Sequence, residues 1–166
     1  MKILETERLY LRVFEESDVN AMSEIHTDEV AMKYIGRGVI INIEQTKEGI
    51  EVFIKNQKEN GYSIWALVEK DSNKVIGHCG FNMLKDKSDI ELTYLLAKDH
   101  WGKGYATEVA KTTLEYGFEK LKFKRIVALT FPENFPSQNV IRKLGMKPDG
   151  KKDLSGIEFL KFSIES

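Results

Sequence analysis

Hydrophobic and polar residues alternate in RLYLRVF, residues 8–14, and a period of two is typical of a strand that buries one face. Two later segments instead space their hydrophobic residues three and four positions apart, as a helix does. The first is 17–26, with Ser17 or Asp18 as its N-cap, and the second is 43–61, which ends on a glycine. The pattern therefore predicts one strand followed by two helices.

The middle of the chain is rich in strand-forming residues, and polar turns separate them. Three antiparallel strands linked by hairpins are predicted over 62–69, 74–83 and 90–96. A long amphipathic helix follows, and lysines at its end would complement the negative helix terminus. Its predicted stripe consists of Ala106, Val109, Ala110, Thr113, Leu114, Gly117 and Leu121. A strand at 125–131, a helix at 137–145 and a strand at 157–165 complete a mixed α/β fold.

Composition narrows the function classes. At 166 residues the chain has the usual size of one domain, so residues 1–166 are predicted to form a single domain. A formal net charge of −1 argues against nucleic acid as a partner. A single cysteine, Cys79, excludes an internal disulfide, and the chain shows neither a membrane-length apolar run nor a signal peptide. These features predict a cytoplasmic protein with no membrane partner.

A glycine-rich turn precedes the long helix in DHWGKGYATE, residues 99–108. Glycines at such a place let backbone N–H groups approach an anion, and the helix dipole adds about half a positive charge there. The string matches neither GxxxxGK[ST] nor GxGxxG, which disfavours a nucleoside triphosphatase or a dinucleotide dehydrogenase. Turn geometry alone is the alternative explanation of the glycines. A second segment, NFPSQNVIRKLGM at 134–146, again follows a strand and enters a helix, and it favours a binding role.

Five segments, in their order and spacing, resemble the GNAT superfamily of acetyl-CoA-dependent N-acetyltransferases, and within it the bacterial ribosomal-protein N-terminal (alanine/serine) acetyltransferases. They are ETERLYLRVFEESD, KVIGHCGF, IELTYLL, WGKGYATE and NFPSQNVIRKLGM. The resemblance implies an α/β fold with a twisted, mainly antiparallel mixed sheet that is splayed at the acetyl-CoA site and flanked by helices on both faces. It also implies that acetyl-CoA is the co-substrate and that a primary amine attacks it directly in a ternary complex.

The resemblance further assigns the residues that would hold acetyl-CoA. Its pantetheine arm would pair with main-chain groups of the splayed strand, since an opened strand leaves N–H and C=O groups without partners. Its diphosphate would rest on backbone N–H groups of the glycine turn. Trp101 stands where the superfamily usually has Gln or Arg, which leaves a side-chain contact from that position open. The expected contacts are Tyr94, Leu95, Leu96, Ala97, Gly102, Lys103, Gly104, Tyr105, Ala106, Thr107, Asn134, Ser137 and Lys143.

Acetyl transfer needs a base for the amine, a donor for the carbonyl oxygen and a proton for the departing thiolate. By resemblance Glu91 is the candidate base, because ELTY matches the Glu-x-x-Tyr pattern of the branch, although Thr93 stands where the branch usually has glycine. The main-chain N–H of Leu95 or Leu96 is the expected donor. A solvated glutamate paired with a lysine is the alternative for Glu91.

The residue that would donate the proton to the thiolate departs most from the pattern of the superfamily. Many members of the superfamily place a tyrosine seven residues after the motif asparagine, where this chain has Ile141. Ser137 matches a serine that the ribosomal-protein branch places near the sulfur, so Ser137 is the candidate donor, with an N-cap as its alternative role. The histidines show no metal-ligand spacing, and no metal is predicted.

Two functions from different classes follow. The first is an N-acetyltransferase that acts on a protein N-terminus, such as that of a ribosomal protein, or on a small amine such as a polyamine, an amino acid or an aminoglycoside. The second is a sensor that binds an acyl-CoA without turnover, and the absent tyrosine at position 141 keeps it open. The segments that would shape the acceptor pocket, around 27–45 and 149–158, carry no motif beyond a glycine-rich, flexible loop over 33–40. A homodimer also stays open, because dimers occur among relatives.

Overall fold

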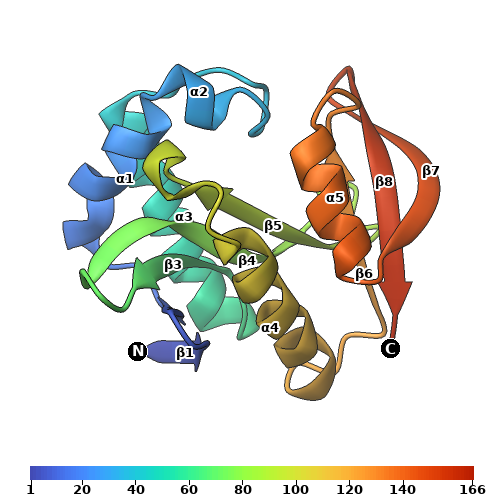
Figure 1. The fold of residues 1–166 in the computed structure, drawn as a ribbon, viewed down its shortest axis with the longest axis horizontal. Helices are drawn as coiled ribbons and strands as arrows, with labels where there is room; N and C mark the ends of the chain where they lie inside the picture. The colour runs from blue at the N-terminus through green and yellow to red at the C-terminus, as the bar shows by residue number, and fades with distance from the viewer.

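The structure, a computed structural model, describes residues 1–166 and places eight strands in one sheet (Figure 1). The order across the sheet is β1-β2-β3-β4-β5-β6-β8-β7, and all neighbouring pairs are antiparallel except β5 and β6. The strands are β1 Lys2–Glu5, β2 Leu9–Arg12, β3 Ile64–Glu69, β4 Lys74–Met83, β5 Ile90–Leu96, β6 Arg125–Thr130, β7 Lys147–Leu154 and β8 Ile157–Glu165. The predicted mixed and mainly antiparallel sheet is confirmed.

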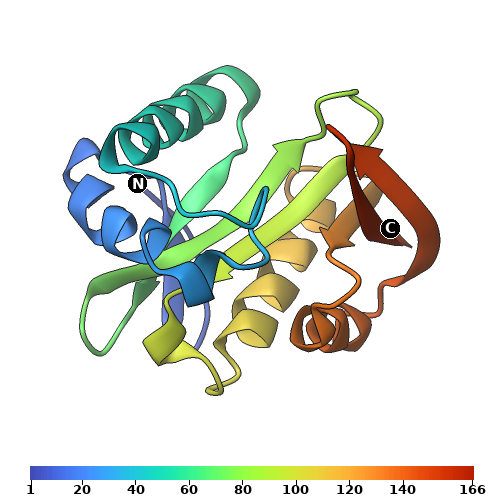
Figure 2. The ribbon, with the colours of Figure 1, turned by 90° about the horizontal axis from the view of Figure 1, so that it is seen from above.

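Helices cover both faces of the sheet. The view from above shows helices on either side of the sheet (Figure 2). The first face carries α1 Val19–His26, α2 Glu29–Met32 and α3 Ile43–Asn60, and the second carries α4 Tyr105–Glu119 and α5 Phe135–Lys143. We refer to them as the α1–α3 face and the α4–α5 face.

The starts of α3 and α4 differ in how their free N–H groups are satisfied. At α3, Asn42 and Gln45 form a reciprocal capping box, with both hydrogen bonds at 2.9 Å. Gly61 ends that helix in the left-handed conformation, as predicted. At α4 the N-cap is Gly104, which has no side chain to accept a hydrogen bond. The first turn of α4 therefore keeps its N–H groups available for another partner.

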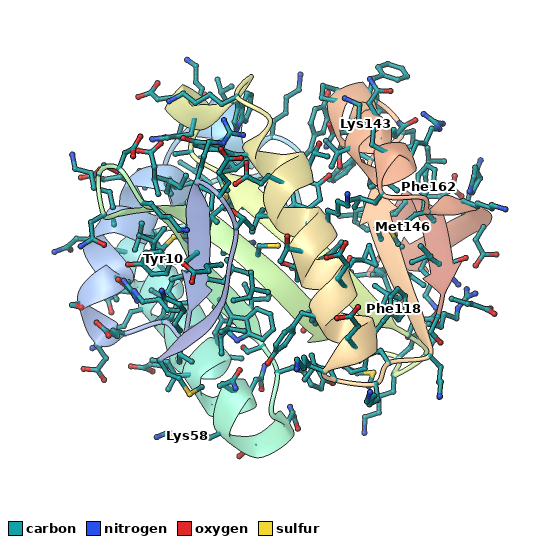
Figure 3. All side chains as sticks on the ribbon, turned by 60° about the horizontal axis from the view of Figure 1, so that its bottom comes forward. Tyr10, Lys58, Phe118, Lys143, Met146 and Phe162 are labelled. Carbon is teal, nitrogen blue, oxygen red and sulfur yellow. The ribbon has the colours of Figure 1, made fainter.

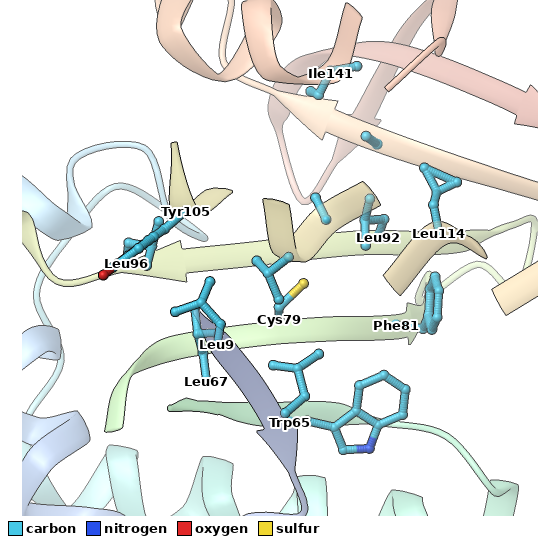
Figure 4. Packing of buried hydrophobic residues seen from close by; sticks show 14 of the residues in the cluster. Leu9, Trp65, Leu67, Cys79, Phe81, Leu92, Leu96, Tyr105, Leu114 and Ile141 are labelled. Atoms are coloured by element: carbon cyan, nitrogen blue, oxygen red, sulfur yellow. The ribbon is translucent and has the colours of Figure 1, made fainter. Parts of the chain in front are cut away.

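Two hydrophobic clusters lie on the two faces of β5. Leu92 and Leu96 belong to the larger one, together with Tyr105 of α4, which lies beside Leu96 (Figure 4). Leu95 belongs to the smaller one, together with Met32 of α2. Because successive side chains of a strand point to opposite faces, one strand serves both clusters. Met146 and Phe162, which are also buried in the larger cluster, lie beneath α5 (Figure 3).

The sheet divides between β5 and β6. These parallel strands pair only through Ile90 with Ile126 and Glu91 with Val127, although β5 has seven residues. The rest of β5 keeps its pairing with β4 but has no strand on its other side. The strands β6, β8 and β7 with α5 thus form a separate half of the sheet (Figure 1). The predicted splay is confirmed, and it begins directly after Glu91.

Three elements lie where the sequence pattern gave no signal. Strand β1 is a short edge strand, and α2 is a single helical turn. Strand β7, KPDGKKDL, is the opposite edge and is mostly exposed, so it lacks the alternation of a strand with one buried face. None of the helices has the length and apolar character needed to cross a bilayer.

The ends of two predicted helices differ in detail from the prediction. Asp18, one of the two predicted residues, is the N-cap of α1, but its carboxylate makes no capping hydrogen bond and instead accepts hydrogen bonds from the Arg12 guanidinium and the Glu15 N–H, at 2.8 Å. Helix α4 ends at Glu119, so the lysines at 120, 122 and 124 lie beyond its last turn. They follow the helix end instead of forming part of it.

Candidate active site

A cavity of about 680 Å³ opens where β5 and β6 separate. Its walls come from residues 92–96 of β5, from the start of α4, from α5 and from the segment around α2, so it reaches both faces of the sheet. All the predicted acetyl-CoA contacts line it except Ala97 and Lys103. The candidate base Glu91 lies just outside the lining.

The open edge of β5 presents the main-chain groups of alternate residues. The N–H of Ala97 donates to the C=O of Ile76 at 2.8 Å, and the register continues unshifted along the strand. In an antiparallel ladder the bonded residues alternate, so the main-chain groups of Leu95 also face β4, and those of Tyr94 and Leu96 face the gap. The sequence expectation is thereby corrected: Leu95 and Ala97 are bonded within the sheet, and the free donors belong to Tyr94 and Leu96.

Trp101 occupies part of this edge. Its indole N–H donates to the C=O of Leu96 at 2.9 Å, which ties the glycine turn to β5. The indole is 48% exposed and lines the cavity. Trp101, which stands in place of Gln or Arg, therefore still donates a side-chain hydrogen bond. The bond uses the C=O of Leu96 and leaves the N–H of Leu96 available to a ligand.

The glycine turn has the geometry of an anion site. Gly102 and Gly104 have φ angles of 77° and 80°, in the left-handed region that favours glycine. The first N–H that bonds back into α4 is that of Glu108, at 3.1 Å from the C=O of Gly104. The N–H groups of residues 105–107 therefore have no partner within the helix, and these residues line the cavity.

The side chain of Tyr105 anchors the turn from behind. Its hydroxyl donates to Glu69 at 2.7 Å, and this hydrogen bond lowers the pKa of that carboxylate. The guanidinium of Arg8 lies 4.5 Å from the centre of the Tyr105 ring and also pairs with Glu108 at 2.8 Å. The ammonium of Lys103 lies 5.7 Å from the same ring. Tyr105 thus offers only its main chain to the cavity, and the sequence pattern gave no signal for Arg8 or Glu69.

Two hydroxyl groups meet across the gap. The Ser137 hydroxyl of α5 and the Tyr94 hydroxyl of β5 are 2.9 Å apart and share a hydrogen bond. Burial raises the pKa of Tyr94 to about 12. Asn134 is the N-cap of α5, because its side chain accepts a hydrogen bond from the Ser137 N–H at 3.2 Å. The alternative role of Ser137 as a cap is therefore excluded. The sequence analysis expected Tyr94 to act through its main chain and did not predict this contact of its hydroxyl.

Ile141, which replaces the usual tyrosine, lines the cavity but has no group that could donate a proton. It is 1% exposed and belongs to the larger hydrophobic cluster, which it reaches from α5 (Figure 4). The hydroxyls of Tyr94 and Ser137 are the polar groups that this part of the gap offers to a leaving group.

Glu91 lies on the α1–α3 face of β5, half-buried and opposite Asn82 of β4. Burial raises the pKa of Glu91 to about 7, and a hydrogen bond with Asn82 opposes this shift. Glu91 makes no ion pair, so the alternative of a lysine-paired surface glutamate is wrong. Thr93, two residues further on the same face, does line the cavity. Thr93 therefore lies between Glu91 and the cavity.

Aromatic side chains join the two halves of the sheet on the α1–α3 face. The ring of Tyr34, in the predicted loop over 33–40, lies 5.8 Å from that of Phe131, which lies 5.1 Å from that of Phe159. The ammonium of Lys33 lies 5.1 Å from the centre of the Tyr34 ring. Lys33 and Tyr34 line the cavity, and Phe131 packs against Tyr34 from outside the lining. We call these three residues the acceptor wall.

The fold and the site together define a class of protein. An open strand edge, an amide-lined anion site and a nearby carboxylate suit an extended acyl carrier with a diphosphate on one face and a nucleophile on the other. No three His, Cys, Asp or Glu side chains gather in a way that could hold a metal ion. The class is that of acyltransferases that use a coenzyme A thioester.

Comparisons with known proteins identify the family. A family model described as an acetyltransferase (GNAT) domain matches residues 8–147. The uncharacterized N-acetyltransferase YnaD of Bacillus subtilis is 34% identical over 145 residues, which cover 87% of this chain and 82% of YnaD. The chain belongs to the GNAT acetyltransferase family and is an N-acetyltransferase.

Solved structures agree with this assignment. A GNAT-family acetyltransferase from Bacillus anthracis is 32% identical, with a TM-score of 0.82 and coverage of 99% of this chain and 98% of that one. RimL, a ribosomal L7/L12 alpha-N-protein acetyltransferase in complex with coenzyme A, shares the fold at 17% identity, with a TM-score of 0.83 and coverage of 99% and 98%. The predicted membership of the GNAT family is confirmed, and the ribosomal-protein acetyltransferase RimL shares the fold.

Proposed function

We propose that the chain transfers the acetyl group of acetyl-CoA to a primary amine by direct attack in a ternary complex. The observation that carries this proposal is the cavity itself. It joins free N–H groups at the start of α4, on one face of the sheet, to the neighbourhood of Glu91 on the other face. A thioester lying in the gap would meet an amine that arrives from the α1–α3 face.

The N–H groups at Gly102, Gly104 and residues 105–107 would hold the diphosphate, and Lys143 on α5 would add a positive charge (Figure 3). The side-chain amide of Asn134 keeps its N–H donors, since only its oxygen caps α5. The pantetheine arm would lie along β5 and pair with the main chain of Tyr94 and Leu96. Lys103 and Ala97, which do not line the cavity, contribute to the shape of the turn and of the sheet.

The amine nitrogen attacks the thioester carbonyl carbon, so that a C–N bond forms and the C–S bond breaks. Glu91 takes the proton of the amine, through the Thr93 hydroxyl or a water molecule, because Glu91 itself stands behind Thr93. A pKa of about 7 suits a base that works near neutral pH. The N–H of Leu96 or Tyr94 stabilises the charge that develops on the carbonyl oxygen.

The departing thiolate receives its proton from the hydroxyl pair of Ser137 and Tyr94. The 2.9 Å hydrogen bond between them lets one hydroxyl replace a proton that the other has given away. This pair would take the place of the tyrosine that is absent at position 141, so the absence of that tyrosine would not by itself require a non-catalytic sensor.

The acceptor is a primary amine, either the α-amine of a protein or a small molecule. An α-amino group titrates near 7.7 to 8.0, so it needs less help from Glu91 than a lysine-type amine does. RimL is described as an acetyltransferase of the α-amine of ribosomal protein L7/L12, and a ribosomal-protein N-terminus is one candidate acceptor for this chain. Three further features also stay predictions: a single domain over residues 1–166, a cytoplasmic location and a homodimer.

The experiment follows cofactor binding and turnover separately. Acetyl-CoA should raise the melting temperature by mass action, by an amount that grows with its concentration above Kd. Thiol release from acetyl-CoA, measured over a panel of amines, should identify at least one acceptor. Binding without release for any amine would favour the sensor instead, and no thermal response at millimolar acetyl-CoA would exclude both functions.

A further inference from the structure

The charges around the cavity are of one sign. None of its 26 lining residues is an aspartate or a glutamate, and its charged members are Lys33 and Lys143. Glu91 and Asp28 are close in sequence to lining residues, but neither of them lines the cavity. Glu91 is the candidate base behind Thr93, and Asp28 caps α2 by accepting hydrogen bonds from the N–H groups of Val30 and Ala31.

The two lysines belong to different substrates. Lys143 is on α5, on the face where the glycine turn would hold the diphosphate (Figure 3). Lys33 directly follows α2 on the other face, next to the cluster that contains Leu95. Lys33 forms no ion pair, and its ammonium lies 5.1 Å from the centre of the Tyr34 ring.

We infer that the acceptor is an amine that carries a carboxylate on an apolar or aromatic body, as an apolar amino acid does, and that Lys33 pairs with this carboxylate. The inference rests on the proposed function and narrows its acceptor. Tyr34 and Ile35 line the cavity beside Lys33 and supply the apolar surface that such a body needs. A lysine without an ion pair is available to bind an acidic group at small cost, because no existing pair has to break.

The same charges disfavour polyamines and aminoglycosides. Each of these acceptors brings additional ammonium groups besides the one that reacts. In this cavity those groups would find no carboxylate and would lie near the ammonium of Lys33, which costs free energy through desolvation and like-charge repulsion. Specificity would thus come from a repulsive element as well as from an attractive one.

The experiment uses the whole chain and ligands that differ in charge. L-phenylalanine and L-phenylalaninamide differ in one negative charge, and spermidine represents the polycations. For each, the thermal shift of the CoA-bound protein reports binding, and thiol release from acetyl-CoA reports turnover. Lys33→Met removes the ammonium and keeps an apolar stem. Lys47→Met is the matched control, because Lys47 is an exposed lysine of α3 that forms no ion pair.

The expected kcat/KM for L-phenylalanine is roughly tenfold above that for its amide, the scale of one charge-assisted contact. Lys33→Met should reduce this ratio to about one while the KM for acetyl-CoA stays unchanged, and Lys47→Met should preserve the ratio. Spermidine should give neither a thermal shift nor turnover.

Equal binding of the acid and the amide, a preference for spermidine, or an equal loss for both ligands in Lys33→Met would overturn the inference. Failure of the proposed function gives a different result. In that case no amine would be acetylated, although CoA still raises the melting temperature. The thermal shifts of the CoA-bound protein would then still decide whether Lys33 selects a carboxylate.

Discussion

The two ends of the cavity are held in place in different ways. At the glycine turn, the groups offered to a ligand are main-chain N–H groups whose directions follow from local backbone conformation. Gly102 and Gly104 adopt left-handed angles, and α4 begins at Tyr105, directly after Gly104. At the acceptor wall, the groups are side chains that come from distant parts of the chain. Tyr34 meets Phe131 across almost 100 residues of sequence and across the divided sheet.

This difference teaches why the cofactor is easier to assign than the acceptor. A turn that holds a diphosphate with its backbone tolerates few sequences, because left-handed angles favour glycine and a helix must start there. A wall made of side chains keeps its shape through packing alone, so many sequences can build it, and each selects a different acceptor. Six single variants, at Glu91, Gly104, the hydroxyl pair and the acceptor wall, test where the boundary between the two ends lies.

Glu91→Gln should have the largest effect, because it removes the base and leaves both ends of the cavity intact. We expect kcat to fall by about 10²- to 10⁴-fold, the usual contribution of general base catalysis, with the thermal shift by acetyl-CoA unchanged. In the parent, kcat/KM should fall as pH decreases through the Glu91 pKa of about 7, because only the ionised carboxylate accepts a proton. Steady-state rates from pH 5 to 9 check both statements, and an unaltered pH profile in the variant would exclude Glu91 as the base.

The same variant has a signature in stability. Since burial raises the Glu91 pKa from its ordinary 4.5 to about 7, its contribution to stability is complete below pH 4.5 and is lost as pH rises through 7. Glutamine does not titrate, so Glu91→Gln should gain about 1–3 kcal/mol in the free energy of unfolding at pH 8 relative to pH 4, compared with the parent. Urea unfolding at the two pH values measures this difference.

Gly104→Ala should affect only the cofactor end. A non-glycine residue in the left-handed region costs about 1–2 kcal/mol and shifts the neighbouring N–H groups, so the KM for acetyl-CoA should rise about five- to tenfold. Gly150→Ala is the matched control, because Gly150 has a φ of 78° against 80° for Gly104 and lies in the exposed strand β7. A similar increase of KM in both variants would mean that strain in the fold, and not the turn, controls acetyl-CoA binding.

The sequence predicted most of what local patterns can encode. The alternation in β2, the hairpin strands β3 to β5 and the glycine stop of α3 all lie where the pattern places them. The splay of the sheet after Glu91 came from the resemblance and is confirmed. Strand β7 gave no signal because both its faces are exposed, and an edge strand with several lysines resembles a loop in sequence.

The parts of the site that the sequence did not predict depend on contacts between distant residues. Which main-chain groups of β5 are free depends on the phase of its ladder with β4, and this phase assigns Leu96 and Tyr94 instead of Leu95. The hydroxyl pair of Tyr94 and Ser137 joins residues 43 positions apart. Such pairs have no local sequence signature, whereas a capping asparagine or a left-handed glycine has one.

Tyr94→Phe and Ser137→Ala test the hydroxyl pair, which lies between the two ends. Each variant should lower kcat by about five- to tenfold, within the lower range of proton-transfer contributions, and should change the KM for acetyl-CoA little. Because the two hydroxyls share one hydrogen bond, the double variant should be about as slow as the slower single variant. If the two losses multiply instead, the hydroxyls act independently, and a shared role in protonating the thiolate is excluded.

Tyr34→Leu and Phe131→Leu should have the smallest effect, and it should be confined to the acceptor. The two rings lie 5.8 Å apart, and an aromatic pair contributes about 0.5–1.5 kcal/mol, so the KM for the acceptor should rise by about two- to tenfold in either variant. The KM for acetyl-CoA should not change, because neither side chain reaches the glycine turn. Phe123→Leu is the control, since that ring packs against Phe81 and Tyr62 in the larger hydrophobic cluster, on the opposite face of the sheet from the acceptor wall. A rise in the KM for acetyl-CoA in Phe131→Leu would show that the acceptor wall also keeps the divided sheet open, and the two ends would then be one unit.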